Sequence, residues 1–163
     1  MYDLMIIGSG PAGISAALTA KARNLNFIWF GSRALSTKIE KAEKIMNYPG
    51  LPAVTGSEMQ SVFLKQIDDC GITITESQVN SIYDCCGYFA AGADNEIYEA
   101  KAVIMTVGMT TTREIEGEAR LLGCGVSYCA TCDGALYKNK DIAVICASPK
   151  FEDEVTFLAG LAN

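Results

Sequence analysis

The sequence has no histidine, few positive charges and no long hydrophobic run, and each of these absences excludes a class of function. Without histidine, the 163-residue chain can form neither a histidine-based catalytic triad nor a histidine-ligated metal site. Its 13 lysines and arginines are outnumbered by 19 acidic residues, which argues against binding to nucleic acid or to an anionic membrane surface. No apolar run reaches the roughly 18 residues that a membrane span needs.

The amino-terminal end also lacks the features of a secretion signal. The stretch MYDLMIIGSG has no basic region ahead of its apolar residues. The 7 cysteines are an odd number without the spacing of a small disulfide-rich domain, which argues against a structural disulfide framework. We therefore expect a cytoplasmic protein in which most thiols are free, with a packed core because 50% of the residues are hydrophobic.

The first 30 residues have the pattern of an α/β protein. An apolar strand is predicted over Tyr2–Ile7, followed by a glycine-rich turn over Gly8–Gly13. An alanine-rich helix over Ile14–Arg23 and a second apolar strand over Asn26–Phe30 come next. Strand, turn, helix and strand in this order open a parallel sheet with a crossover helix.

The rest of the chain is predicted to complete one domain and begin another. Expected strands cover residues 72–74, 78–84, 88–91, 96–100, 102–107 and 142–146, and expected helices cover 57–69 and 151–161. Gly92-Ala93-Asp94-Asn95 is a hairpin turn signal. A junction near 115–123 divides the chain into 1–117 and 118–163. The second domain is expected to be incomplete, because its strand and helix have no further strand to return to.

The turn over Gly8–Gly13 fits the pattern G-x-G-x-x-G in its usual place between a strand and a helix. Gly8 permits the tight turn, Gly10 lets the backbone approach a pyrophosphate, and Gly13 lets the helix pack closely on the strand. A plain tight turn is the alternative. The ribose-binding acid about 20 residues further on is absent, and Arg33 could accept a 2′-phosphate. The pattern alone therefore leaves both NADP and FAD open.

A paired-cysteine motif, Cys129-Ala130-Thr131-Cys132, is followed at once by Asp133. Structural zinc would need two more ligands at similar spacing, and neither a second C-x-x-C nor a histidine is present. A redox pair fits better, because two spacer residues allow a reversible disulfide. Asp133 could then protonate a leaving thiolate during exchange. Two inert buried cysteines are the remaining alternative, and no metal site is predicted.

Taken together, these motifs resemble the low-molecular-weight, flavin-dependent thioredoxin reductases. GVSYCATCDG at 125–134 is close to a signature of that family, and GSGPAG at 8–13 is similar to its FAD pyrophosphate loop. Asn47-Tyr48-Pro49-Gly50 resembles its turn beside the flavin, and AVIMTVG at 102–108 resembles its strand ending in A-T-G.

The resemblance implies an FAD-binding, Rossmann-like domain of the GR2 type, followed by a disulfide-bearing α/β domain. It implies that Cys132 faces the flavin, that Cys129 attacks the disulfide of thioredoxin, and that Asp133 is the acid. It also implies a homodimer. The residues expected to contact FAD are Gly8, Ser9, Gly10, Pro11, Ala12, Gly13, Gly31, Ser32, Lys38, Asn47, Val79, Thr106 and Gly108.

The sequence departs from this family at three places. Cys146-Ala147-Ser148-Pro149-Lys150-Phe151 stands where the family has the glycine motif that binds NADPH, and it contains no glycine. We therefore expect NADPH not to bind there. Ser36-Thr37-Lys38-Ile39 replaces a Gly-Gly-Gln-Leu sequence beside the flavin. No Gly-Asp motif for a return to the FAD domain is found, so we expect these residues to be the amino-terminal part of a longer chain.

The pattern that remains is most similar to the ferredoxin-dependent flavin thioredoxin reductases of clostridia, which have lost the NADPH motif in this way. A one-electron donor needs only a docking surface near the flavin, and Lys38, Lys41 and Lys44 could receive an acidic ferredoxin. Two alternatives stay open. The protein could be an NADPH-dependent thioredoxin reductase with an atypical pocket, or a non-catalytic flavin-binding redox sensor. No nucleic-acid or membrane partner is expected.

Overall fold

The chain forms two compact units, which are described separately below. The computed structural model describes residues 1–108 and 115–163. One unit comprises Met1–Ile39 with Gln60–Thr112, and the other comprises Glu40–Met59 with Arg113–Asn163. The second unit thus takes in a segment from the amino-terminal half. The division into 1–117 and 118–163 stays a prediction.

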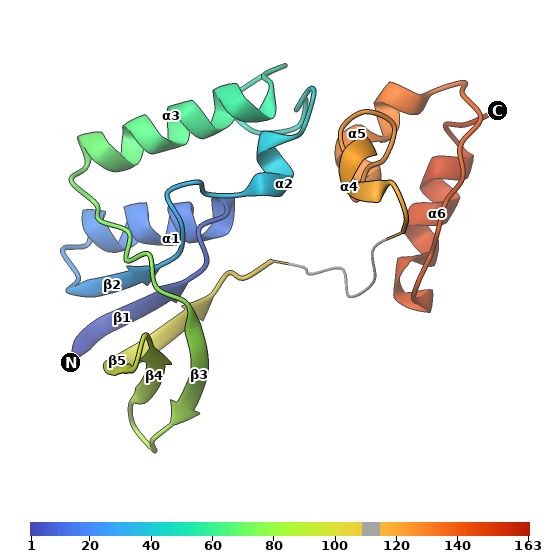
Figure 1. Cartoon of the computed structure of the whole chain (residues 1–163). Helices are drawn as coiled ribbons and strands as arrows, with labels where there is room; N and C mark the ends of the chain where they lie inside the picture. Colours follow the sequence, from blue (N-terminus) through green and yellow to red (C-terminus); the bar gives the residue numbers. More distant parts are fainter. Residues whose placement is uncertain (109–114) are drawn as a thin grey trace. The chain divides into compact units, whose positions relative to one another are not determined.

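Figure 1 shows the strands and helices along the chain. The strands are β1 (Tyr2–Ile7), β2 (Phe27–Phe30), β3 (Val79–Asp84), β4 (Phe89–Ala93) and β5 (Glu96–Met105). The α-helices are α1 (Pro11–Ala22), α2 (Thr37–Glu40), α3 (Gly56–Asp69), α4 (Glu118–Leu121), α5 (Ala130–Asp133) and α6 (Glu152–Ala159). Two short 3₁₀-helices are η1 (Gly134–Tyr137) and η2 (Pro149–Phe151).

All five strands belong to one mixed sheet in the order β2-β1-β5-β4-β3. β1 lies parallel to both β2 and β5, whereas β3, β4 and the first half of β5 are antiparallel. Residues 4–7 of β1 are all buried, as expected for a parallel strand that is covered on both faces. The predicted α/β class is confirmed, and the parallel part places the Gly8–Gly13 turn at the carboxyl edge of the sheet.

β5 joins two strands that the sequence predicts separately, 96–100 and 102–107. Its first half pairs with β4 and its second half with β1, and Ala100 pairs with both neighbours. The hairpin that connects β4 to β5 turns at Asp94 and Asn95, whose φ angles are 49° and 64°. Two consecutive positive φ angles are typical of the two-residue type I′ turn, so the predicted hairpin is confirmed.

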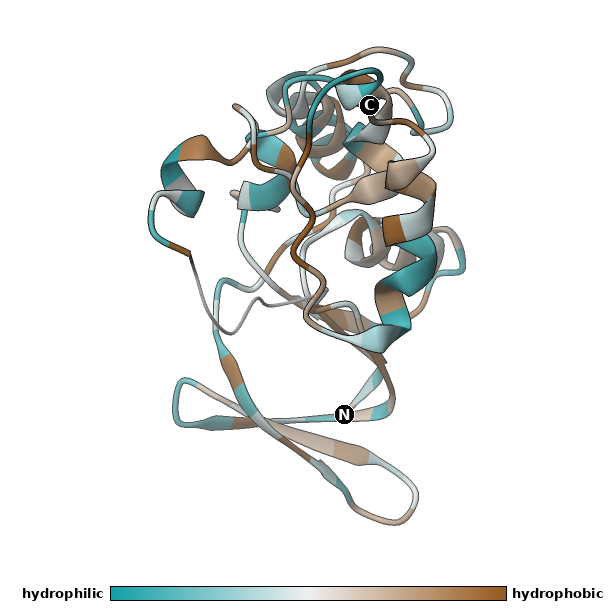
Figure 2. Cartoon of the chain, turned by 90° about the vertical axis from the view of Figure 1, so that its right-hand side faces the viewer, coloured by the Kyte–Doolittle hydropathy of each residue, from teal (hydrophilic) through white to brown (hydrophobic). Residues whose placement is uncertain are grey.

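The predicted strands at 72–74 and 142–146 are wrong. The first has no strand pairing, and only Thr75, the next residue, forms an isolated bridge, with Phe30. The second is an extended segment that pairs with no strand among the described residues, and it runs into the hydrophilic first turn of α6 (Figure 2). A hydrophobic segment becomes a strand only where a neighbouring strand completes its hydrogen bonds, and the sequence pattern does not report that neighbour.

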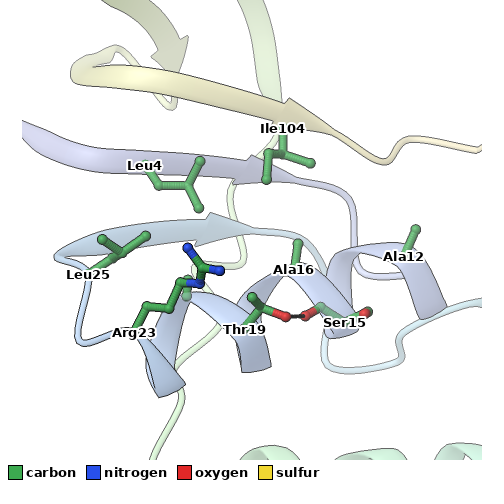
Figure 3. A pocket seen from close by; sticks show the side chains of 9 residues that line it. Leu4, Ala12, Ser15, Ala16, Thr19, Arg23, Leu25 and Ile104 are labelled. Carbon is green, nitrogen blue, oxygen red and sulfur yellow. Dashed lines mark hydrogen bonds between the residues drawn. The ribbon is translucent and has the colours of Figure 1, made fainter.

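The helices follow their sequence signals more closely. α3 matches the helix predicted at 57–69, and a capping box begins it: Glu58 N–H donates to Thr55 Oγ1, while Thr55 N–H donates to Glu58 Oε2. α1 packs against β1 and β5, with Ile14, Ala17 and Ala20 buried. Beside α1 lies an open hollow of about 400 Å³ (Figure 3). Its lining comprises Leu4, Ala12, Ser15, Ala16, Thr19, Ala20, Arg23, Leu25 and Ile104.

Candidate functional site

The turn between β1 and α1 is closed by contacts that only glycine permits. Gly8 has a φ angle of 113°, and a Cβ atom there would overlap the Thr106 carbonyl group. A Cβ atom at Gly13 would overlap the Gly8 carbonyl oxygen. The same oxygen accepts hydrogen bonds from Trp29 Nε1 at 2.8 Å and from Thr106 Oγ1 at 3.0 Å. The turn is therefore held by β2 and by the end of β5.

Ser9 links the turn to the end of β2. Its Oγ donates to the Leu35 carbonyl oxygen at 3.0 Å and accepts from the Ser32 N–H at 3.0 Å. A Cβ atom at Gly31 would press on the Ser9 side chain. The structure thus brings together Gly8, Ser9, Gly13, Gly31, Ser32 and Thr106.

The open side of this turn fits a dinucleotide pyrophosphate. Nothing lies within 4 Å of a Cβ atom placed on Gly10, and no side chain caps the start of α1. With Pro11 in the first turn, the first N–H groups of a 12-residue helix are left to a ligand. The residues present therefore fit the phosphates of FAD. Arg33, the candidate for a 2′-phosphate, instead pairs with Asp68 at 3.0 Å.

Four further residues predicted to contact FAD are not brought to this turn by any contact that the structure describes. Gly108 follows β5 with a φ angle of 69°. Val79 begins β3 and packs against the sheet core, and Lys38 is exposed on α2. Asn47 belongs to the second unit. Their part in FAD binding stays a prediction.

The second unit contains a disulfide between Cys129 and Cys132, with their Cα atoms 5.3 Å apart. Cys129 caps α5: its Sγ accepts from the Cys132 N–H at 3.2 Å, and its carbonyl oxygen accepts from the Asp133 N–H at 3.1 Å. The five free cysteines are Cys70, Cys85, Cys86, Cys124 and Cys146. The cysteine motif predicted as a redox pair therefore forms a disulfide at the start of a short helix.

Asp133 is held beside this disulfide by its neighbours. Its Oδ2 accepts a hydrogen bond from Ser127 Oγ at 2.5 Å. Burial, and after it the negative charge of Asp133, raises the pKa of Tyr137 above its usual value. Gly134 is buried, and a Cβ atom there would lie 3.2 Å from Leu158. The absence of a side chain at Gly134 thus lets the cysteine motif pack closely on α6.

Just before this motif, Glu118 ties two backbone segments together. It is only 8% exposed, accepts from the Ile115 N–H at 2.5 Å and accepts a hydrogen bond from the Tyr128 hydroxyl. The Ile115 bond first, and then the Tyr128 bond, lower the pKa of Glu118 below its ordinary value. An ionised Glu118 therefore anchors the residue next to Cys129.

The segment 146–151 has none of the features of the first turn. The Ser148 side chain caps the start of η2 by accepting from the Lys150 N–H at 3.4 Å. The first turn of α6 then carries Glu152, Asp153 and Glu154. An open hollow of about 520 Å³ lies between this segment and α6. The Ser148 hydroxyl thus occupies an N–H group of η2 and carboxylates lie in the first turn of α6, whereas the first turn of α1 has neither.

Comparison with known protein families gives a match over residues 2–149 to the pyridine nucleotide-disulphide oxidoreductases. The chain belongs to this family. The FAD turn and the disulfide that the sequence predicts are the two features expected of such a protein. Among the described residues, no helix is long and apolar enough to cross a membrane.

Individual relatives confirm the resemblance to thioredoxin reductases. A thioredoxin reductase of Bacillus subtilis is 30% identical over 100% of this chain and 52% of its own length. A ferredoxin-flavin thioredoxin reductase of Clostridium acetobutylicum is 44% identical, with a TM-score of 0.67 over 99% of this chain and 56% of its own. A thioredoxin reductase of Streptococcus pyogenes is 32% identical, with a TM-score of 0.82 over 99% and 53%. The chain thus spans about half the length of the relatives it matches.

Sequence reasoning missed three residues that shape these sites. Trp29 fixes the Gly8 carbonyl group, Glu118 anchors Tyr128, and Ser127 holds Asp133. Only Ser127 carried a local signal, because a serine two residues before a helix cap commonly bonds the backbone there. The contact between Trp29 and Gly8 joins residues 21 positions apart in sequence. Glu118 lies in a segment without a recognisable motif.

Proposed function

We propose that this chain belongs to a flavin-dependent disulfide oxidoreductase that reduces thioredoxin. The observation that carries the proposal is the Cys129–Cys132 disulfide with Asp133 beside it, in a protein whose other unit carries a glycine turn fitted to FAD. The relatives are named thioredoxin reductases, which supports thioredoxin as the substrate.

FAD bound at the Gly8–Gly13 turn would supply the electron pair that opens the disulfide. Cys129 then attacks the disulfide of thioredoxin as a thiolate and forms a mixed disulfide, and Cys132 attacks Cys129 to release the reduced product. Asp133 gives the proton that a leaving thiolate needs. The assignment of Cys129 to the substrate and of Cys132 to the flavin follows from the resemblance.

We further propose that the electron donor is reduced ferredoxin and not NADPH. The second loop, 146–151, has a side chain at every position, and three carboxylates begin α6. Negative charge at a helix start repels a pyrophosphate, and side chains at Cys146 and Ser148 block the close approach of the backbone that Gly10 permits at the first turn. The 44% identity to an enzyme named ferredoxin-flavin thioredoxin reductase supports the same donor. Lys38, Lys41 and Lys44 would receive the acidic ferredoxin, in a cytoplasmic homodimer.

The test follows the absorbance of the bound flavin under anaerobic conditions. NADPH, NADH and photoreduced ferredoxin are added in turn to the FAD-loaded protein, and oxidised thioredoxin is then added. We expect bleaching by ferredoxin alone, followed by reoxidation on addition of thioredoxin. Bleaching by NADPH at a catalytic rate would contradict the proposed donor and establish an NADPH-dependent enzyme. Unchanged thioredoxin reduction by a Cys132→Ser variant would contradict the proposed chemistry, whereas a wild type that reduces no thioredoxin with any donor would favour a redox sensor.

A further inference from the structure

Ser127 has a set of contacts that points to a role in the exchange reaction. Its Oγ accepts from the Cys129 N–H at 3.0 Å. Two acceptors surround the same hydroxyl, Asp133 Oδ2 at 2.5 Å and the Cys129 carbonyl oxygen at 3.4 Å. The hydroxyl has one hydrogen, and the shorter contact to a carboxylate is the stronger of the two. Ser127 therefore connects the backbone of Cys129 to the carboxyl group of Asp133.

We propose that Ser127 is a positioning residue that holds the Asp133 carboxyl group for proton delivery during thiol–disulfide exchange. This inference rests on the proposed role of Asp133. An Asp133 side chain without this contact would keep more of its rotamer freedom, because the hydrogen bond from Ser127 fixes Oδ2 in one place. Holding a proton donor in one orientation lowers the barrier of a step that needs it.

The two oxygen atoms of the Asp133 carboxyl group let the contact with Ser127 persist while the proton moves. When an external thiolate attacks one sulfur of the disulfide, a new S–S bond forms to that sulfur. The other sulfur leaves with the electron pair of the broken bond. The protonated Asp133 gives its proton to that leaving thiolate and becomes a carboxylate. Ser127 can donate to Oδ2 both while Oδ1 carries the proton and after that proton has passed to the thiolate.

The experiment is a double-mutant cycle on the exchange reaction. The oxidised chain is reduced by dithiothreitol, free thiols are trapped by alkylation, and mass spectrometry of the peptide with Cys129 and Cys132 gives the second-order rate constant. The proteins compared are the wild type, Ser127→Ala, Asp133→Asn, the double variant, and Ser127→Thr. Thr156→Ala is the matched control, since it removes a hydroxyl that bonds only the backbone of α6.

We expect Ser127→Ala to slow the reaction by about three- to tenfold, the effect of one typical lost hydrogen bond. In the Asp133→Asn background the same change should have no effect, because a residue that acts through another contributes nothing once that other is gone. Ser127→Thr keeps the hydroxyl and should retain most of the rate, and Thr156→Ala should leave it unchanged.

Each contrary outcome overturns the inference. If Ser127→Ala slows the reaction equally with and without Asp133, Ser127 only supports the backbone at Cys129. If Ser127→Ala has no effect, or Ser127→Thr is as slow as Ser127→Ala, the hydroxyl does not position Asp133. If Asp133→Asn itself has no effect, the proton-donor role fails as well. The reaction contains neither flavin nor ferredoxin, so failure of the proposed electron donor leaves these results unchanged.

Discussion

Replacing Gly13 by alanine tests whether the Gly8–Gly13 turn is closed as tightly as its contacts indicate. The new Cβ atom would overlap the Gly8 carbonyl oxygen and lie 2.8 Å from Thr106 Oγ1. Overpacking of this kind costs up to about 3 kcal/mol, and a backbone carbonyl cannot move aside as a flexible side chain can. Alanine also gains about 1 kcal/mol of helix propensity over glycine within α1.

The difference is a destabilisation of about 2 kcal/mol, because the steric term is larger than the propensity term. For a chain of this size it corresponds to a fall in Tm of about 4–8 °C. Thermal and urea unfolding followed by circular dichroism measure both quantities without FAD. An unchanged or raised Tm in Gly13→Ala would refute the reasoning, since propensity would then outweigh packing.

Gly10→Ala is the matched control for the same turn. The added Cβ atom has nothing within 4 Å, and Gly10 has an extended conformation that alanine adopts freely. Its stability should stay within about 0.5 kcal/mol of the wild type. FAD binding, measured by quenching of flavin fluorescence, should weaken by about tenfold or more, because the methyl group occupies the space that a pyrophosphate approaches. Equal affinities in both proteins would show that the phosphates bind elsewhere.

Further predictions concern the other contacts. Thr106→Val should destabilise the protein by about 1–2 kcal/mol in urea unfolding, because it removes the hydroxyl that bonds the Ile7 and Gly8 carbonyl groups. The pKa of Glu118 lies below its ordinary value of 4.5, so its contribution to stability is present above that pH and is lost as the pH falls through the lower value of the folded state. Glu118→Gln should therefore flatten the acid side of the stability profile, and a profile unchanged between pH 3 and 5 would contradict the assignment. Replacing Glu152, Asp153 and Glu154 by glutamine removes the negative charge but leaves 146–151 without glycine, so NADPH should still not reduce the flavin. Rapid bleaching of the flavin by NADPH in that variant would show that the charge alone opposes binding of the cofactor.

The sequence predicts well those parts of the fold that depend on near neighbours. The capping box at Thr55 and Glu58, the turn at Asp94 and Asn95, and the glycine pattern at 8–13 each act within a few residues. Strand pairing depends on distant residues, and there the predictions were less accurate. Segment 142–146 has the composition of a strand, yet among the described residues it has no partner, while 96–105 is one strand because two different neighbours pair with its halves.

The same distinction applies to the candidate site. Cys129, Cys132 and Asp133 are recognisable because their chemistry depends on spacing within one short helix. Trp29 and Thr106 secure the Gly8 carbonyl group from strands that approach it only in the folded sheet. Nothing in the sequence around Trp29 reveals this contact, and Thr106 is predicted as an FAD contact, not as the residue that bonds this carbonyl group. A reading of the sequence therefore finds the groups that react, and it misses most of those that hold them.

The two segments that precede α1 and α6 differ in what a phosphate group would meet at each of them. Both segments are hydrophobic and both lead into a helix through a turn. At the first, Gly8 and Gly13 let the turn close, and the N–H groups at the start of α1 stay uncapped. At the second, the Ser148 hydroxyl accepts from the Lys150 N–H, and carboxylates occupy the first turn of α6. A phosphate would have to displace the Ser148 hydroxyl from η2 and offset that charge, so under the proposed function glycines introduced at 146–151 should not by themselves create an NADPH site.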